Sequence, residues 1–180
     1  GQGQNTWEAA SFQNITLSLV LMPRFLDAKE QFYLSMAVAL SLYDSLSGYV
    51  PVPDALKIKW PNDIFYQDKK ICGILIQNLL KNQHLHHSVV GVGINVNQTQ
   101  FQSPQASSLK LSNGQHYALP ELIEAFLKAL ETRYIQLRHC KYDRLRFDYL
   151  RQLYAYQEAR LFEAQGRVFE GKILGVDNVG

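Results

Sequence analysis

Residues 59–76 read Lys59-Trp-Pro-Asn-Asp-Ile-Phe-Tyr-Gln-Asp-Lys-Lys-Ile-Cys-Gly-Ile-Leu-Ile76, and they contain most of the chemically informative side chains of the sequence. Residues 56–59 predict a short strand that enters this segment. Trp60-Pro61-Asn62 predicts a rigid corner, because proline fixes its own φ angle and favours an extended residue before it. Residues 64–66 are expected to resume the strand after the corner.

A turn and a second strand complete this segment. Gln67-Asp68-Lys69 is expected to turn the chain into an apolar strand over residues 70–80. Asn62 and Asp63 would then lie at one strand end and Lys70 at the start of the next. An ammonium and a carboxylate in these places are suited to share one small anionic ligand.

Composition indicates a globular protein without a strongly charged partner. The chain has 180 residues, 47% hydrophobic and 19% charged, with a net charge of +2. This is enough to bury a core, and the scattered basic residues do not predict binding to nucleic acid. The two cysteines, Cys72 and Cys140, are too few for a disulfide framework, which favours a reducing compartment. With no membrane-spanning run and no signal peptide, the predicted location is the cytoplasm.

Both ends of the sequence predict an internal portion of a longer protein. Gly1-Gln-Gly-Gln-Asn-Thr-Trp7 begins inside a glycine-bearing loop, and Asp177-Asn-Val-Gly180 is a turn signal without a following strand. The glycines permit close backbone approach to a ligand, and Trp7 can stack on a flat ring. The alternative is a terminal segment whose Trp7 packs into the core.

The first regular elements are predicted to be a strand and a core helix. Residues 14–22 alternate apolar and polar side chains, as expected for a strand with one apolar face. Asp27 is expected to cap a helix over residues 28–46, with Glu30 completing a capping-box pattern and Gly48 ending the helix.

A glycine-bearing strand is predicted over residues 87–97, antiparallel to residues 71–80. Gly91 and Gly93 are two residues apart and therefore face the same side, leaving a strip of sheet without side chains. Asn95 continues that face with an amide. The pattern differs from a dinucleotide-binding fingerprint, because the third glycine and the following helix are missing.

Three histidines, His84, His86 and His87, lie just before and at the start of this strand. His84 and His86 would share a strand face, but no third metal ligand is near them in sequence. An exposed hairpin is therefore preferred over a metal site.

The rest of the chain predicts helices followed by a hairpin. A polar loop over residues 99–108 leads to a short turn-bearing element at 109–115. Helices are expected over 121–139 and 142–154, the first with Pro120 in its first turn. Residues 158–174 predict a β-hairpin that begins a small all-β appendage.

Taken together, three stretches resemble the catalytic domain of biotin–protein ligases. They are Gly1-Gln-x-x-Asn-x-Trp7-Glu8, Lys59-Trp-Pro-Asn-Asp63 with Lys70-x-x-Gly73, and Gly91-x-Gly-Ile-Asn95-x-Asn97. Their order and spacing match the family, and Ala106-Ser-Ser-Leu109 fits after the third stretch. The resemblance covers essentially the whole chain.

The resemblance implies an α+β fold with a mixed, mainly antiparallel sheet packed with helices, similar to class II aminoacyl-tRNA synthetases. Residues 1–157 would be the catalytic domain, and residues 158–180 the start of a small SH3-like β domain. The implied reaction forms biotinyl-5′-AMP and pyrophosphate from biotin and Mg-ATP. A lysine of a biotin carboxyl carrier protein, part of an acetyl-CoA or related carboxylase, then attacks the mixed anhydride.

The same resemblance implies roles for individual residues. Gly1 and Gln2 belong to the loop over biotin and the adenylate, although an arginine occupies the Gln2 position in many relatives. Trp7 matches the residue that packs on adenine, and Lys70 the lysine that contacts biotin's carboxylate and the α-phosphate. The nucleotide and metal region is matched by Asn62, Asp63 and Asn95, and the strip beneath biotin by Gly73, Gly91 and Gly93.

The chemistry agrees with these roles. A fixed ammonium at Lys70 favours a carboxylate that attacks phosphorus, without any proton transfer. Asp63 can hold Mg²⁺, orient the incoming amine or act as a general base. The alternative is a purely structural role, in which the Asp63 carboxylate caps a turn. Lys59 serves packing as readily as nucleotide binding.

Two other functions remain open from the sequence. A lipoate–protein ligase or octanoyltransferase shares this general fold, but its motifs around the binding lysine differ. A non-catalytic biotin-binding regulator is the second alternative, in which case any DNA-binding domain would lie outside these residues. Both monomers and homodimers are compatible with the resemblance.

Overall fold

A five-stranded antiparallel sheet forms the centre of the computed structural model, which describes residues 10–164 and 166–180. Its strand order within this part of the chain is β1-β5-β4-β3-β2. The strands are β1 Asn14–Leu21, β2 Leu56–Lys59, β3 Asp63–Tyr66, β4 Lys69–Lys81 and β5 His84–Asn95. The predicted α+β fold with a mainly antiparallel sheet is confirmed. The predictions for Gly1, Gln2 and Trp7 fall outside the described residues.

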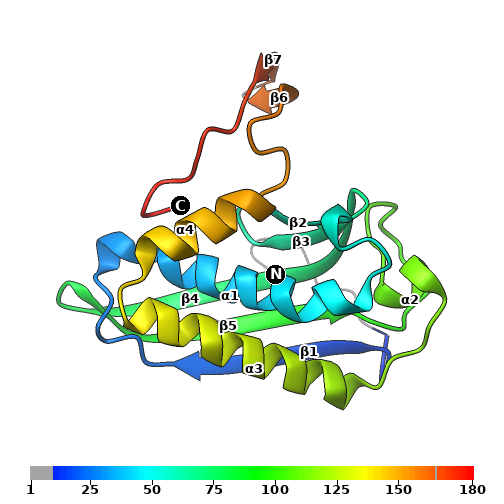
Figure 1. The fold of residues 1–180 in the computed structure, drawn as a ribbon, viewed down its shortest axis with the longest axis horizontal. Helices are drawn as coiled ribbons and strands as arrows, with labels where there is room; N and C mark the ends of the chain where they lie inside the picture. Colours follow the sequence, from blue (N-terminus) through cyan, green and yellow to red (C-terminus); the bar gives the residue numbers. More distant parts are fainter. Residues whose placement is uncertain (1–9, 165) are drawn as a thin grey trace.

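Helices cover one face of this sheet (Figure 1). They are α1 Phe32–Leu46, α3 Leu119–Arg138 and α4 Tyr142–Gln152, while the short α2 Leu109–Asn113 lies at one end. Helix α1 is buried on nearly every side, as expected for a helix that is apolar all round. Among the described helices, none combines the length and the apolar character needed to cross a bilayer.

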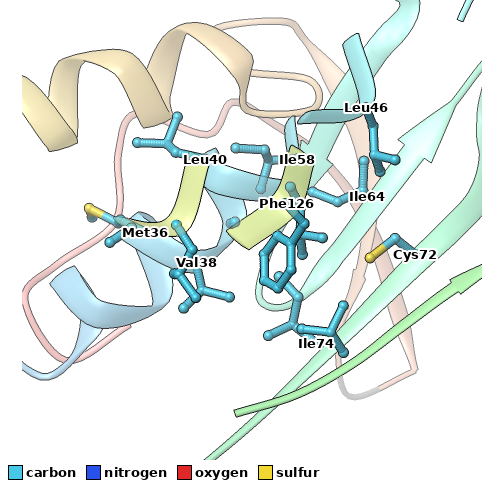
Figure 2. Close-up of a cluster of buried hydrophobic side chains, with 14 of the residues drawn as sticks. Met36, Val38, Leu40, Leu46, Ile58, Ile64, Cys72, Ile74 and Phe126 are labelled. Carbon is cyan, nitrogen blue, oxygen red and sulfur yellow. The ribbon is translucent and has the colours of Figure 1, made fainter. Parts of the chain in front are cut away.

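The hydrophobic core fills the space between α1, α3 and the sheet (Figure 2). Helix α1 contributes Met36, Val38 and Leu40, and α3 contributes Phe126. Ile58, Ile64, Cys72 and Ile74 approach from three neighbouring strands. Each fully buried side chain of this size stabilises the fold by about 1.5–3 kcal/mol, so this core is the main reason for the two-layer arrangement.

The corner at Trp60-Pro61-Asn62 differs from its prediction. The chain reverses there instead of resuming the same strand, because β2 and β3 pair antiparallel, with Ile58 opposite Ile64. Reversal places both isoleucines in the core, where they are completely buried. It also lets the main-chain groups of the two short strands bond to each other.

Several predicted boundaries were also wrong. A 3-10 turn occupies Ala28–Glu30, and Asp27 caps that turn by accepting from the Lys29 N–H at 3.2 Å, so α1 begins only at Phe32. Residues 109–113, expected as a turn-bearing element, form α2. Ser108 caps the start of α2 through the Leu111 N–H, and Gly114 ends it with a φ of 76°.

A separate two-stranded hairpin follows α4. It consists of β6 Arg160–Ala164 and β7 Arg167–Gly171, so β7 ends three residues before the predicted limit. The chain then returns to the helices along residues 172–180 (Figure 1). There the Phe32 N–H donates to the Asn178 carbonyl at 3.2 Å, and the Arg146 guanidinium donates to the Val176 carbonyl at 2.6 Å.

One arginine connects the three long helices. Arg133 of α3 pairs with Asp44 of α1 at 2.7 Å and with Asp148 of α4 at 2.6 Å. The side chains of Arg133 and Asp148 are each only 12% exposed. Because this charge is largely removed from water, its loss would leave two carboxylates without their shared cation.

We therefore expect Arg133→Met to lower the free energy of unfolding by about 2–4 kcal/mol in urea denaturation, since removal of one partner from a buried ion pair is strongly destabilising. Lys128→Met on the same helix is the control, because it removes only the exposed pair with Glu124. Equal stability of the Arg133 and Lys128 variants would contradict this account.

Candidate active site

The face of the sheet opposite the helices carries the residues that the sequence singled out. Asp63 pairs with Gly73, and Gly73 pairs with Gly93 on the next strand. The three residues therefore lie side by side across β3, β4 and β5, about 5 Å apart from strand to strand. Their neighbours Ile64, Ile74 and Ile94 are buried in the core, so the row faces away from the helices.

A β-bulge brings Lys70 to this same face. Lys70 and Gly73 are an odd number of residues apart, and regular alternation would place them on opposite faces. The register shifts here, with Phe65 opposite Lys70 but Ile64 opposite Cys72. Ile71 and Cys72 are consequently both buried in the core, and Lys70 is turned towards Asp63.

Lys70 and Asp63 form a close ion pair. The Lys70 Nζ atom is 2.6 Å from Asp63 Oδ1, and the two side chains are 34% and 21% exposed. The predicted proximity of this ammonium and carboxylate is thus present in the fold. Partial burial strengthens the attraction relative to a fully exposed pair.

The main chain of Lys70 is held on its other edge by the loop after β5. The Lys70 N–H donates to the Gln105 carbonyl, and the Ser107 N–H donates to the Lys70 carbonyl, both at 2.8 Å. Pairing between β4 and β5 ends at Cys72, so residues 105–107 take the place of β5 beside Lys70. Periodicity gave no signal for this contact, because it falls in a polar loop.

Asn95 is buried at the end of the same face. Its Nδ2 group donates to the Ser107 carbonyl at 2.9 Å. Its Oδ1 atom is inaccessible to solvent, and no described residue donates a hydrogen bond to it. A buried acceptor without a donor is costly, which makes this atom a candidate contact for a ligand.

Gly91 leaves part of this face without a side chain. A Cβ atom added to Gly91 would lie 3.6 Å from the Leu75 carbonyl oxygen and 3.7 Å from Leu75 Cβ, which are ordinary contacts. Packing within the described chain therefore does not by itself require glycine here. The absence of a side chain instead leaves space above the sheet.

Asn62 and Lys59 have structural partners. Asn62 Nδ2 donates to the Ile74 carbonyl and the Ile74 N–H donates to the Asn62 carbonyl, both at 2.8 Å, so Asn62 joins the corner to β4. The Lys59 Nζ atom lies 4.6 Å from the centre of the Phe65 ring. Of the three lysines in residues 59–76, Lys70 is the one that the structure pairs with Asp63.

A cavity of about 320 Å³ adjoins the corner but was not predicted from the sequence. Phe32 and Ser35 of α1 line one side, and Trp60 and Asn62 line another. Val179 and Gly180 line a third side. Local sequence patterns could not locate this cavity, because its lining residues are far apart in the chain.

The three histidines lie at the tip of the β4–β5 hairpin. Nδ1 of His86 is 3.1 Å from Nδ1 of His87, next to a second register shift between Leu79 and Leu80. Within residues 10–164 and 166–180, no group of three or more His, Cys, Asp or Glu side chains is arranged to hold a metal ion.

The sequence profile of the biotin/lipoate A/B protein ligase family matches residues 1–95. This is more than half of the 180 residues, and the chain belongs to that family.

Individual curated proteins are similar over most of this chain. The chain is 26% identical over 187 residues to the bifunctional ligase/repressor BirA of Bacillus spizizenii, covering 100% of this chain and 56% of that protein. It is 32% identical over 144 residues to a biotin–[acetyl-CoA-carboxylase] ligase of Mycobacterium tuberculosis, covering 77% and 51%. The chain spans about half the length of the curated relatives it matches.

Solved structures share the fold. The apo biotin protein ligase of Aquifex aeolicus superposes with a TM-score of 0.76 at 23% identity, over 93% of this chain and 73% of that one. The same enzyme in complex with biotin and ATP gives a TM-score of 0.74, over 92% and 68%. The two-layer arrangement is therefore the one these ligases adopt.

Cys72 provides a chemical test of this arrangement. Burial, and secondarily the charge of Asp63, raises the pKa of the Cys72 thiol well above its usual range, whereas Cys140 is exposed. A raised pKa keeps the thiol protonated and unreactive at pH 8. We expect a disulfide reagent such as DTNB to titrate one thiol in the native chain and two in urea. Cys140→Ser should remove the native reaction, and rapid modification of both native thiols would disagree with the core position of Cys72.

Proposed function

We propose that this chain carries the biotin-activating site of a biotin–protein ligase. The observation on which the proposal chiefly rests is the Lys70–Asp63 ion pair at the edge of the strip formed by Gly73, Gly91 and Gly93. Family membership and the names of the relatives support biotin and ATP as substrates. The product would be biotin attached to a lysine of a carboxylase carrier domain.

The first step requires a cation where two anions meet. A carboxylate oxygen of biotin attacks the α-phosphorus of ATP, the bond to the β-phosphate breaks and pyrophosphate leaves. Lys70 contacts both the carboxylate and the α-phosphate in this proposal. Its ammonium offsets their repulsion and the charge that develops at phosphorus, without gaining or losing a proton.

Asp63 becomes available as Lys70 turns to these anions. The biotin carboxylate and the α-phosphate compete with the Asp63 carboxylate for the Lys70 ammonium, because all three groups accept hydrogen bonds from the same cation. In the second step the lysine amine of the carrier attacks the acyl carbon, AMP leaves and the amine loses a proton. A carboxylate released from its ion pair is suited to orient that amine or to accept the proton.

The residues present also fit a magnesium ion that accompanies ATP. Mg²⁺ prefers oxygen ligands and is commonly held by one or two carboxylates together with substrate phosphates. Asp63 is the carboxylate we assign to this contact. When bound, the ion would neutralise phosphate charge.

Asn95 and Asn62 are assigned to the nucleotide side of the site. The buried Asn95 Oδ1 atom would accept a hydrogen bond from the nucleotide. Asn62 would line the same region while its amide group holds Ile74. Gly1 and Gln2 are proposed to close over biotin and the adenylate, and Trp7 to pack on adenine.

The carrier domain of the carboxylase is the proposed macromolecular partner.

Within this chain, residues 1–157 are proposed to be the catalytic domain. Residues 158–180, which include the β6–β7 hairpin, are proposed to begin a small SH3-like domain.

Biotin-dependent exchange of labelled pyrophosphate into ATP tests this function in the full-length protein. Lys70→Ala should fold normally and lower the exchange rate by about 10²–10³-fold, the effect typical of removing a charge-stabilising group. Lys69→Ala is the matched control, because Lys69 is the adjacent, exposed residue of β4 and should leave exchange near the wild-type rate. Wild-type exchange by Lys70→Ala would refute the role of this lysine.

The same assay separates biotin from lipoate. The family also includes lipoate ligases, so lipoic acid should replace biotin in a parallel reaction. We expect exchange with biotin and little with lipoic acid. Exchange with lipoic acid alone would replace the proposed substrate, and biotin binding without exchange would indicate a regulator instead of an enzyme.

Gly91→Ala tests the bare strip. The new methyl group meets Leu75 only at ordinary contact distances, so the fold should be retained. If biotin's rings lie on this strip, the methyl group should weaken biotin binding by about 1–3 kcal/mol, the usual cost of overpacking.

Titration calorimetry with biotin measures this loss of affinity. Gly48→Ala is the control, because an added Cβ atom there meets no heavy atom within 4 Å and Gly48 lies beyond the end of α1. Unchanged biotin affinity in Gly91→Ala would place the rings elsewhere.

A further inference from the structure

Tyr154, just after the end of α4, connects three parts of the segment that carries the candidate site. Its main-chain N–H donates to the Ile58 carbonyl of β2 at 2.8 Å. Its ring lies 6.0 Å from the ring of Phe65 in β3. Its hydroxyl donates to Asp68 Oδ1 at 2.7 Å. One residue outside the sheet thus holds β2, β3 and the turn that follows.

That turn determines the position of Lys70. Gln67 and Asp68 are the only two residues between β3 and β4, and their φ angles are 48° and 62°. Left-handed backbone is unfavourable for most residues other than glycine, asparagine and aspartate, so Gln67 in particular depends on support from the surrounding structure. Lys70 follows two residues later, at the bulge that turns it towards Asp63.

The hydroxyl of Tyr154 is well suited to give this support. A hydrogen bond to an ionised carboxylate is stronger than one between neutral groups. The bond to Asp68 is also the main reason that the pKa of the Tyr154 hydroxyl is raised above its usual value, as expected for a phenol that donates to a carboxylate. The contact joins residues 86 positions apart and therefore ties the turn to the helical layer.

We propose that Tyr154 is a positioning residue for Lys70: through Asp68 it fixes the β3–β4 turn, and so the placement of the Lys70 ammonium. The inference rests on the proposed function, because its effect is seen in the step that Lys70 assists. Tyr154 contacts the turn and not Lys70 itself, so its influence passes through the turn. Small displacements of a catalytic group are sufficient to slow a reaction strongly.

Three variants separate this role from packing. Tyr154→Phe removes only the hydroxyl and keeps the ring against Phe65. Asp68→Gly removes the acceptor while glycine accepts the left-handed backbone readily. Asp68→Asn keeps an oxygen acceptor in a residue that tolerates this conformation. Tyr156→Phe is the matched control, since the Tyr156 hydroxyl accepts a hydrogen bond from the side chain of the neighbouring Gln157 and not from the β3–β4 turn.

Biotin-dependent pyrophosphate exchange in the full-length protein, at a temperature well below each variant's Tm, is the measurement. Tyr154→Phe and Asp68→Gly should each lower kcat about tenfold. Asp68→Asn and Tyr156→Phe should stay within twofold of the wild type. The double variant Tyr154→Phe/Asp68→Gly should be no slower than either single variant, because both remove one hydrogen bond.

Each other result counts against the inference in a distinguishable way. Wild-type kcat in Tyr154→Phe, with only a lower Tm, would reduce Tyr154 to a packing residue. Multiplied losses in the double variant, or an Asp68→Asn as slow as Asp68→Gly, would overturn the route through the turn. Absence of exchange in the wild-type protein would overturn the proposed function, and the inference with it.

Discussion

Within residues 10–164 and 166–180, helices cover only one face of the central sheet, and this constraint determines where the chemistry of the molecule is possible. Ile58, Ile64 and Ile74 must all face α1 and α3 to be buried. Strand alternation then directs the residues between them to the other face, where Asp63 and Gly73 lie side by side. The core and the candidate site are therefore two consequences of one register, and a shift of one residue would destroy both.

The bulge at Ile71 is the exception on which the site depends. The bulge keeps two successive apolar side chains, Ile71 and Cys72, in the core and places Lys70 on the face opposite the helices. The ion pair between Lys70 and Asp63 therefore depends on this interruption of regular strand pairing. The surrounding contacts compensate for the interrupted pairing. Residues 105–107 bond to the main chain of Lys70 on one edge, and the Gln67–Asp68 turn fixes its approach from β3.

Local patterns in the sequence were sufficient for most strands and helices, and for the proximity of Asp63 to Lys70. Alternation in residues 14–22 and the glycines at 91 and 93 identified strands correctly, because each pattern reflects burial of one face. The reversal at Trp60-Pro61-Asn62 was missed because a proline corner is compatible with either direction. Contacts such as Tyr154 with Asp68 could not be inferred, since they join segments 86 residues apart and have no periodic signal.

The β6–β7 hairpin is attached to the helical layer at two places. The chain enters it after α4 and leaves it along residues 172–180, and the two connections bond to each other where the Gln157 N–H donates to the Ile173 carbonyl. The returning segment is then fixed to Phe32 and Arg146. A unit on one linker can swivel freely, whereas a unit on two joined connections keeps few rotations. A load on the hairpin would therefore be transmitted to the end of α4 and the start of α1 together.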